Sequence, residues 1–409
     1  MSQAIFQGAA GFPPQLLQDP YPFYQMLRNS NPVFRVPVGD ADSPGLWILT
    51  RHRDVQAVLK DARFSVDRRR AAIVEQFKDR LPLNAALGEE GGLRSMLLMD
   101  APDHTRVRGL VSKAFTPRRV AALRPRIEAI LTALLDSIDG GASFDLIDAV
   151  AAPLPAIVIA ELLGVPAADH RQFKEWSSAL VSAIGSANPL EGRERFEHAL
   201  GQLLDYLRGI IAERRRAPQD DLISAMLEAQ EERDALSDAE LLATSNLLLI
   251  AGHETTTNLI GNGTLALLRN PEQFARLQGD RSLMRSAIDE LLRYDSPVQA
   301  TARVALEAVA LEDATLPAGA LVMTAIGAAN RDPEVFDDPD RLDLGRASNH
   351  HLSFGFGAHF CLGAPLARLE AEVAFDALLT RFPKLELASD TLSYRPSPIL
   401  RGLVALPVR

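Results

Sequence analysis

The sequence predicts a mainly α-helical fold with small β sheets, and three observations lead to this fold class. From about Pro102 to Arg293, apolar residues recur at the three- and four-residue spacing of amphipathic helices, as in Ile127, Ile130, Leu131, Leu134 and Leu135. Strand-like segments at 32–38 (PVFRVPV) and 45–50 (GLWILT) are separated by Gly, Asp and Pro. After Tyr294, β-branched residues alternate with turn signals, and the acidic, proline-containing stretch 330–346 is typical of coil. Because internal repeats and low-complexity linkers are absent from the sequence, we expect a single domain over residues 1–409.

The composition of the chain is typical of a globular protein and argues against nucleic-acid-binding and membrane-spanning classes. The 47% apolar and 23% charged residues are typical of a globular chain. The 43 basic and 53 acidic residues give a formal net charge of −10, which argues against a nucleic-acid partner because such proteins carry a net basic domain. The N-terminus has no basic segment followed by an apolar stretch, and no run approaches the about 18 apolar residues of a membrane span. We therefore expect a cytoplasmic protein without a membrane anchor.

The chain contains one cysteine, Cys361, within FGFGAHFCLGA (354–364). A single cysteine forms no internal disulfide and cannot supply a cysteine-rich zinc or iron–sulfur site. On composition alone, an unpaired cysteine is most often a small buried hydrophobe. Pro365, however, is tolerated only in the first turn of a helix, and it predicts a helix from about Ala364 to Phe382. The thiol would then face a helix N-terminus, whose partial positive charge lowers a thiol pKa and favours the thiolate that a metal needs.

The glycines and phenylalanines around Cys361 predict a tight apolar loop. Gly355, Gly357 and Gly363 permit turns with positive φ and let the backbone pass close to a bulky group. Phe354 and Phe360 would shield the sulfur from water. Phe360 also occupies the third glycine position of G-x-G-x-x-G, so the loop is not a dinucleotide-binding fingerprint.

A long helix forms the second informative segment. Ser237 and Glu240 make a capping-box pattern, and helical periodicity continues to Arg269 before Pro271 ends it. At about 1.5 Å per residue this helix would be about 50 Å long and cross the whole molecule. Its middle, LLLIAGHETTTN (247–258), changes abruptly from apolar to polar.

The polar segment 247–258 has two interpretations from its residues alone. His253 and Glu254 begin the zinc motif H-E-x-x-H, but Thr257 stands where the second histidine is required, so a zinc site would lack one ligand. Alternatively, Thr255 donates its hydroxyl to the carbonyl of Ala251, one turn back, and only bends the helix.

Together these segments resemble the cytochrome P450 family. Phe354, Gly357, Cys361 and Gly363 match its haem-ligand loop F-x-x-G-x-x-x-C-x-G, and residues 251–256 match its oxygen-binding signature A-G-x-E-T-T. The resemblance implies haem b (iron protoporphyrin IX) with Cys361 as the axial thiolate ligand, a contact role for Phe354 and Gly363, and backbone N–H donors near the sulfur. The haem would lie between the 237–269 helix and the helix that follows the cysteine loop.

The resemblance also assigns roles on the 237–269 helix. Ala251 and Gly252 have too little side chain to block a flat ring, and a local widening of the helix there would leave a groove for dioxygen and water. Thr255 would hydrogen-bond the activated dioxygen, and Glu254 would relay protons from solvent. Family members that use peroxide directly lack this acid–threonine pair. The chain is therefore expected to activate dioxygen with electrons that come ultimately from NAD(P)H.

Two further residue sets match the family by position. Burial of the two haem propionates requires cations or strong donors, and His104 and Arg108 match the family's H-x-x-x-R clamp, with Arg303 and His359 as further contacts. Each alone would be an ordinary surface cation. The second set is structural: Glu290 and Arg293 match the E-x-x-R pair, with Arg341 as the expected third member of a buried cluster.

The function implied is a monooxygenase that hydroxylates or epoxidises a hydrophobic small molecule. Its expected partners are a ferredoxin and a ferredoxin reductase that dock on the cysteine side, where four residues offer a basic patch: Arg106, Lys113, Arg118 and Arg119. We expect a monomer that resembles the soluble bacterial members. The family places the substrate pocket along 72–98, 173–189, 247–251, 298–302 and 399–400, with candidate contacts Leu247, Ile250, Val298 and Leu400.

Two alternatives stay open at this point. A thiolate haem sensor or carrier needs no proton relay, and Glu254 with Thr255 argues against it. A zinc hydrolase is disfavoured by Thr257.

Overall fold

The computed structural model describes residues 14–36, 43–77, 89–90, 93–138, 143–170, 172–173, 175–176, 179–180, 193–228 and 236–409. The helices described in its first half are α1 (Pro14–Gln18), α2 (Tyr21–Ser30), α3 (His52–Lys60), α4 (Ala72–Phe77), α6 (Asp103–Ala114), α7 (Pro117–Ala122), α8 (Arg124–Asp136) and α9 (Pro153–Leu162). Further helices follow: α11 (Arg193–Arg216), α12 (Leu222–Glu228), α13 (Asp238–Arg269), α14 (Pro271–Gly279), α15 (Met284–Tyr294), α16 (Ile326–Ala329) and α17 (Ala364–Arg381). The prediction of a mainly α fold is confirmed.

Part of the β structure lies in segments that the sequence predicted. The main sheet contains β1 (Val33–Val36), β2 (Leu46–Leu49), β3 (Phe64–Ser65), β7 (Ala300–Ala305) and β10 (Leu321–Ala325) in the order β1-β2-β10-β7-β3. β10 runs parallel to β2 and antiparallel to β7. Three two-stranded sheets complete it: β11 (Pro407–Val408) with β6 (Phe144–Asp145), β4 (Glu89–Glu90) with β5 (Leu93–Arg94), and β8 (Val309–Ala310) with β9 (Thr315–Leu316). The sheet thus joins the N-terminal strands to the chain that follows α15. Strands β1, β2, β7 and β10 lie in segments that the sequence predicted, whereas β3, β4, β5 and β6 were not predicted.

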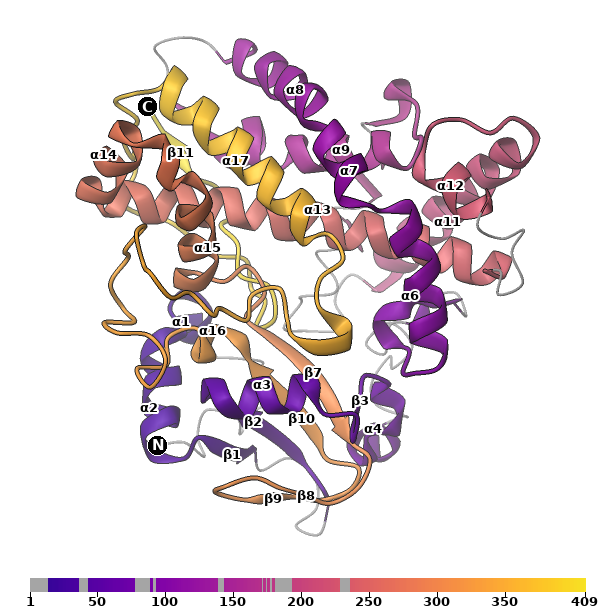
Figure 1. Ribbon diagram of the computed structural model, residues 1–409, viewed down its shortest axis with the longest axis vertical. Helices are drawn as coiled ribbons and strands as arrows, with labels where there is room; N and C mark the ends of the chain where they lie inside the picture. The colour runs from indigo at the N-terminus through magenta and orange to yellow at the C-terminus, as the bar shows by residue number, and fades with distance from the viewer. Residues whose placement is uncertain are drawn as a thin grey trace.

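Helix α13 crosses the helical part of the molecule, with α17 packed against it and the main sheet below (Figure 1). The predicted capping box is present, because Ser237 and Glu240 exchange both side-chain-to-backbone hydrogen bonds. The helix continues to Arg269 without interruption. The predicted local widening at Ala251 and Gly252 is therefore wrong, since regular backbone hydrogen bonding is kept through this segment.

Four apolar clusters of described residues support these layers, and two of them bear most directly on the site. The larger one packs α8, α9, α11, α13 and α17 together, and a smaller one joins the main sheet to α3 and α16. Within the described ranges, none of the helices combines the length and apolar character needed to span a membrane.

Candidate functional site: the Cys361 loop and the face of α13

The loop that carries Cys361 is held in a tight conformation before α17. Gly355 and Gly357 have φ of +73° and +74°. A Cβ on Gly357 would also lie 3.0 Å from the Leu59 carbonyl oxygen of α3, so a side chain is excluded both by backbone conformation and by contact. The Cys361 amide donates to the Phe354 carbonyl at 2.8 Å, which closes the loop and brings the sulfur to the start of α17.

The sulfur of Cys361 accepts hydrogen bonds from the amides of Gly363 and Ala364 at the N-terminus of α17. A Cβ on Gly363 would lie 3.9 Å from the sulfur, so this glycine borders it closely. Burial raises the pKa of the Cys361 thiol, and the two amides and Arg108 lower it only in part. The amides of the helix N-terminus thus favour the thiolate, burial of the sulfur opposes them, and a bound metal cation would favour the thiolate further.

The two phenylalanines of the loop differ from each other. Phe354 is partly buried, with the Arg368 guanidinium 4.4 Å above its ring. Phe360 is 42% exposed, and its ring centroid lies 6.2 Å from that of Phe354. Phe360 therefore does not shield the sulfur as predicted, because its side chain points to the surface.

The four predicted propionate contacts come from α6, β7 and the loop. The rings of His104 and His359 lie 4.0 Å apart. Arg108 donates to the Phe360 carbonyl at 2.6 Å, and buried Arg303 donates to the Ala302 carbonyl at 2.9 Å. Burial, with His104 and Arg303 nearby, lowers the pKa of His359 to about 3. Burial, followed by repulsion from Arg68, lowers the pKa of Arg303 to about 10.

Arg68 is a member of this cationic cluster that sequence reasoning missed. It begins the short 3₁₀ helix η1 (Arg68–Arg70), and its buried Nε has no hydrogen-bond partner among the described residues. Asp100 is the acidic group that acts on the cluster, and it already accepts hydrogen bonds from the Ser65 hydroxyl and the Val66 amide. Arg68 stands in the run DRRR (67–70). Nothing in that run distinguishes the partly buried arginine from the exposed ones.

The charge balance of this cluster provides a test of the predicted haem. Arg68, Arg108 and Arg303 are at least partly buried, and burial lowers the pKa of each of them. Buried cations are stable in proteins when anions pair with them. Among the described carboxylates, Asp100 acts on Arg303, whereas no carboxylate is seen to offset the burial of Arg68 or Arg108. A ligand with two carboxylates beside Cys361 fits these residues.

The least buried positions in the middle of α13 share one face. Leu247, Ile250, Ala251 and Thr255 are half-buried or exposed, in a helix whose neighbouring residues are buried. The Thr255 hydroxyl donates to the Ala251 carbonyl at 2.9 Å, as predicted. Gly252 faces elsewhere: a Cβ there would contact Ile159 of α9 at 3.4 Å. The predicted role of Gly252 beside a flat ring stays a prediction, and the glycine also borders α9.

Glu254 follows Ile250 by one turn of α13 and is buried. It forms an ion pair with Arg395, at 3.2 Å between Nη1 and Oε1, and the Asn258 side chain lies beside it. Burial raises the pKa of Glu254, whereas Arg395 and then Asn258 lower it. Sequence reasoning missed Arg395, because 141 positions separate it from Glu254 and no local pattern connects the two.

The predicted Glu–Arg–Arg cluster exists with a different third member. Arg293 and Glu290 are fully buried and joined by two 2.8 Å hydrogen bonds. The third residue is Arg346, whose Nε lies 3.1 Å from Glu290. Arg341 is 64% exposed and pairs with Asp338 and Asp343. Only its backbone carbonyl joins the cluster, as an acceptor for Arg293 and Arg346, so the prediction of the Arg341 side chain was wrong.

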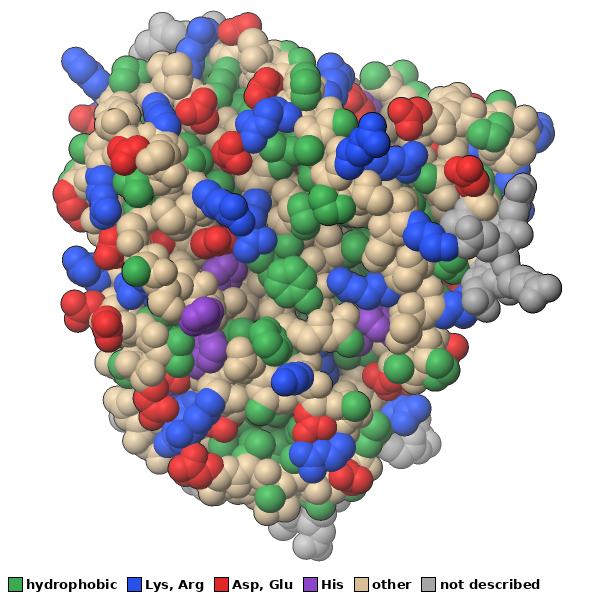
Figure 2. All heavy atoms as spheres, viewed as in Figure 1, with side chains coloured by type: hydrophobic (Ala, Val, Ile, Leu, Met, Phe, Trp, Pro, Cys, Tyr) green, Lys and Arg blue, Asp and Glu red, His purple; other side chains and the backbone are tan. Residues whose placement is uncertain are grey.

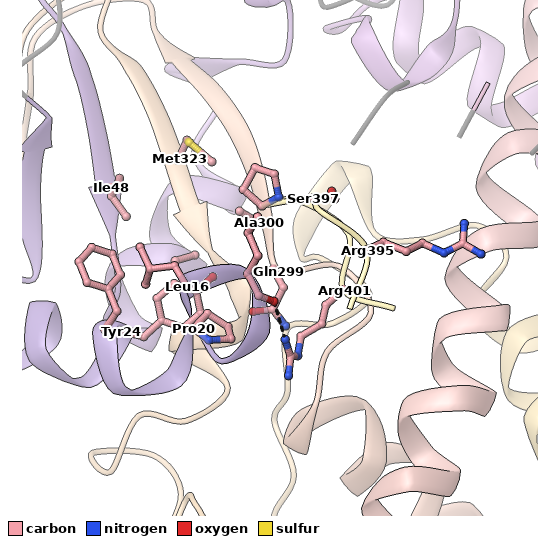
Figure 3. Close-up of a pocket in the computed structure, with 14 residues that line it drawn as sticks. Leu16, Pro20, Tyr24, Ile48, Gln299, Ala300, Met323, Arg395, Ser397 and Arg401 are labelled. Carbon is pink, nitrogen blue, oxygen red and sulfur yellow. Dashed lines mark hydrogen bonds between the residues drawn. The ribbon is translucent and has the colours of Figure 1, made fainter. Parts of the chain in front are cut away.

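The predicted substrate contacts are partly brought together. Val298 and Leu400 form an antiparallel bridge, while Leu247 and Ile250 lie on the half-buried face of α13. Much of the predicted pocket, including 78–88, 91–92 and 181–189, lies outside the described residues. A cavity between α2, β10 and the chain 395–401 includes none of the four contacts (Figure 3).

The zinc interpretation finds no support in the described part of the chain. Thr257 donates its hydroxyl to the His253 carbonyl at 3.0 Å. Among the described residues, no group of three His, Cys, Asp or Glu side chains converges on one point.

Comparisons with known proteins agree with this geometry. A sequence profile described as Cytochrome P450 matches residues 18–397. Cytochrome P450 107B1 of Saccharopolyspora erythraea is 47% identical over 401 residues, which cover 96% of this chain and 95% of the relative. Polyketide biosynthesis cytochrome P450 PksS of Bacillus subtilis is 42% identical over 396 residues, 95% of each chain. The tirandamycin C-bound structure of the P450 monooxygenase TamI superposes with a TM-score of 0.86 at 41% identity and covers 97% of this chain and 99% of TamI. The chain therefore belongs to the cytochrome P450 family of haem-dependent monooxygenases.

Proposed function

We propose that Cys361 is the axial thiolate ligand of haem b and that the chain activates dioxygen to oxidise a hydrophobic small molecule. The observation that carries the proposal is the cluster of Arg68, Arg108 and Arg303 around the cysteine loop, in which Asp100 acts on Arg303. His104 and His359 complete the set of donors. Such a set is suited to two propionates.

The residues of the loop hold and tune the ligand. The amides of Gly363 and Ala364 donate to the sulfur, which withdraws electron density and moderates the donor strength of the thiolate. When bound, haem supplies an iron that can be reduced and can activate dioxygen, and thiolate ligation favours cleavage of the O–O bond. Glu290, Arg293 and Arg346 hold the coil before this loop and have a structural role.

Glu254 and Thr255 supply protons and hydrogen bonds to the reaction. Thr255 lies on the half-buried face of α13 and has its hydroxyl oriented by the Ala251 carbonyl. Glu254 is buried beside the partly exposed Arg395, so it can exchange protons with solvent and pass them towards Thr255.

The predicted substrate contacts are apolar, and two relatives indicate the class of molecule that is oxidised. Leu247, Ile250, Val298 and Leu400 are aliphatic, which suits a ligand that is mainly hydrocarbon. The name of PksS refers to polyketide biosynthesis, and TamI was solved with tirandamycin C. A fatty acid, terpenoid, steroid or macrolide is therefore the proposed class of substrate.

Electrons are proposed to come from NAD(P)H through a ferredoxin reductase and a ferredoxin, to a single-domain, monomeric enzyme in the cytoplasm. Lys113, Arg118 and Arg119 are exposed near the cysteine loop, and Figure 2 presents this face, with Lys and Arg side chains over α6, α7 and α17. Arg106 is engaged with Glu240, which removes it from the predicted patch.

Spectroscopy of the reduced holoenzyme tests the proposal. With carbon monoxide, the wild type should show the strongly shifted Soret band of thiolate ligation, and Cys361→Ser should lose that band. Arg68→Gln should lower the haem content, because one cation of the propionate cluster is removed. An unshifted band in the wild type would contradict the ligand assignment.

A substrate screen separates an enzyme from a sensor or carrier. Hydrophobic compounds that change the spin state of the ferric protein should be converted to oxygenated products when ferredoxin, reductase and NAD(P)H are present. Spin-state changes without product for every binding compound would favour the sensor or carrier.

A further inference from the structure

We propose that Arg395 is a positioning residue that restrains the Glu254 carboxylate and links it to the C-terminal hairpin 394–403. The inference rests on the proposed function of Glu254 as the proton relay. It adds a control of that relay by a segment that also borders the substrate contacts.

The ion pair joins a buried group to an accessible one. The Glu254 side chain is 5% exposed, and that of Arg395 is 34% exposed. Arg395 is thus the part of the pair that reaches solvent. Among the described charged side chains, Arg395 is the one whose charge acts on the Glu254 carboxyl group, and the neutral Asn258 side chain is the other neighbour that lowers its pKa.

The hairpin 394–403 is attached to α13 by its polar residues. The Arg395 amide donates to the Gly402 carbonyl at 2.9 Å, and Tyr394 bridges Leu403. Asn262 of α13 donates to the Arg401 carbonyl at 2.9 Å. Glu254, Asn258 and Asn262 therefore form a stripe at four-residue spacing that faces the hairpin.

The tip of the same hairpin reaches the proposed substrate contacts. The Leu400 amide donates to the Ser397 hydroxyl at 2.9 Å, and Leu400 bridges Val298. The Gln299 amide donates to the Ile399 carbonyl at 2.7 Å. A ligand that displaces Leu400 therefore also moves the hairpin that carries Arg395, which precedes Leu400 by five residues.

The other side of the hairpin offers room for that movement. Arg395, Ser397 and Arg401 line the cavity of Figure 3 opposite apolar side chains of α2 and β10 such as Tyr24 and Met323. Figure 3 shows the Arg395 side chain extending away from the other lining residues, towards α13.

The neighbouring arginine is held more firmly. Arg401 bonds to Asp295 at 2.7 Å, donates to the Leu17 and Gln18 carbonyls, and stacks on Tyr394 at 3.6 Å. These contacts keep Arg401 in place when the hairpin tip moves. The Arg395 guanidinium is held by fewer contacts, chiefly its ion pair to Glu254, so it can shift when the hairpin tip moves.

Removal of the Arg395 charge leaves Glu254 buried without its cation. The carboxyl group should then take up a proton at higher pH, because burial disfavours its charged form and an adjacent cation favours it. A Glu254 carboxyl group that is already protonated before substrate binds can deliver protons in the absence of substrate. More NAD(P)H should then be consumed per molecule of product.

Infrared titration of the ferric holoenzyme measures this directly. The carboxyl band of Glu254 is assigned by its absence in Glu254→Gln, and its protonation is followed against pH. In Arg395→Gln the midpoint should lie at a pH higher by about one unit. Arg395→Lys, which keeps the charge, should stay close to the wild type. Arg409→Gln, which removes an exposed arginine paired with Glu386, is the matched control and should not move the midpoint.

A second comparison tests the link to the hairpin. A compound that changes the spin state of the wild type should raise the Glu254 midpoint, and it should have no such effect in Arg395→Gln. An unchanged midpoint in either comparison overturns the proposal. The titration needs no turnover, so it remains decisive if the protein binds haem and ligands but forms no product, the outcome that would defeat the proposed function instead.

Discussion

At the scale of single residues, burial decides which of two nearby arginines is structural. Arg341 and Arg346 lie five positions apart in the same coil. The Arg346 side chain is 9% exposed and bonds to Glu290, which is fully buried. The Arg341 side chain is 64% exposed and bonds to surface aspartates. The energetic consequence should differ accordingly, because a buried carboxylate that loses a partner has no water to replace it.

Arg346→Ala should destabilise the protein by about 1–3 kcal/mol and lower its haem content. Arg341→Ala, the matched control, should cost about 0–1 kcal/mol because it removes exposed pairs. Denaturant unfolding and the absorbance ratio of haem to protein measure both effects. Equal losses in the two variants would contradict the assignment of Arg346.

A second residue-scale prediction concerns Glu370 on α17, which is 1% exposed and hydrogen-bonded to Thr256 of α13. Burial raises its pKa to about 8 from an ordinary value of 4.5. Between these two values the unfolded chain has released the proton that the folded protein keeps, so stability falls as pH rises.

Glu370→Gln removes this titration, so its stability relative to the wild type should increase from pH about 5 to about 8. The midpoint of denaturant unfolding, measured at several pH values, follows this difference. Glu372→Gln, at a half-exposed position paired with Arg124, serves as control and should give a constant difference. A constant difference for Glu370→Gln as well would show that Glu370 is ionised in the folded protein.

At the scale of elements, the cysteine loop depends on helix α3 for its shape. Gly357 has φ of +74°, and its backbone lies so close to α3 that a Cβ there would be 3.0 Å from the Leu59 carbonyl oxygen. The loop therefore cannot accept a side chain at this position unless it moves away from α3. Such a shift would also displace Cys361, four residues later.

Gly357→Ala should cost about 1–3 kcal/mol through backbone strain, and the holoenzyme should lose haem faster to a scavenger protein. Gly209→Ala is a suitable control, since Gly209 is an exposed residue of α11 whose added Cβ would have no neighbour within 4 Å. That control should be neutral or slightly stabilising. Unchanged haem retention in Gly357→Ala would contradict the proposed coupling between α3 and the loop.

For the molecule as a whole, a net charge of −10 is compatible with a local patch of basic side chains. Of the four residues predicted to receive a ferredoxin, Arg106 bonds to Glu240, and Arg119 lies 3.7 Å from Asp220. Lys113 and Arg118 are exposed. Docking by charge should therefore depend on a smaller patch than the sequence suggested.

Reversal of charge in the double variant Arg118→Glu and Arg119→Glu should slow reduction by ferredoxin several-fold at low ionic strength. The difference from wild type should shrink at high salt, where exposed charges are screened beyond about 3–10 Å. Arg409→Glu carries a charge change at the C-terminus and should have little effect. Stopped-flow reduction at several salt concentrations makes the comparison, and a salt-independent rate in all variants would rule out the patch.

Local sequence patterns were enough to predict the fold class, the capping box, the start of α17 and the pairing of Glu290 with Arg293. These features depend on local periodicity, on proline and on residues three or four positions apart, and neighbours in sequence are then neighbours in space. Four features became visible only in the folded protein: Arg346 replaces Arg341, Arg68 turns inward, Gly252 faces Ile159 and Arg395 pairs with Glu254. Each of these features depends on which side of a coil or helix is buried against a distant segment. The spacing of residues along the chain does not predict such long-range contacts.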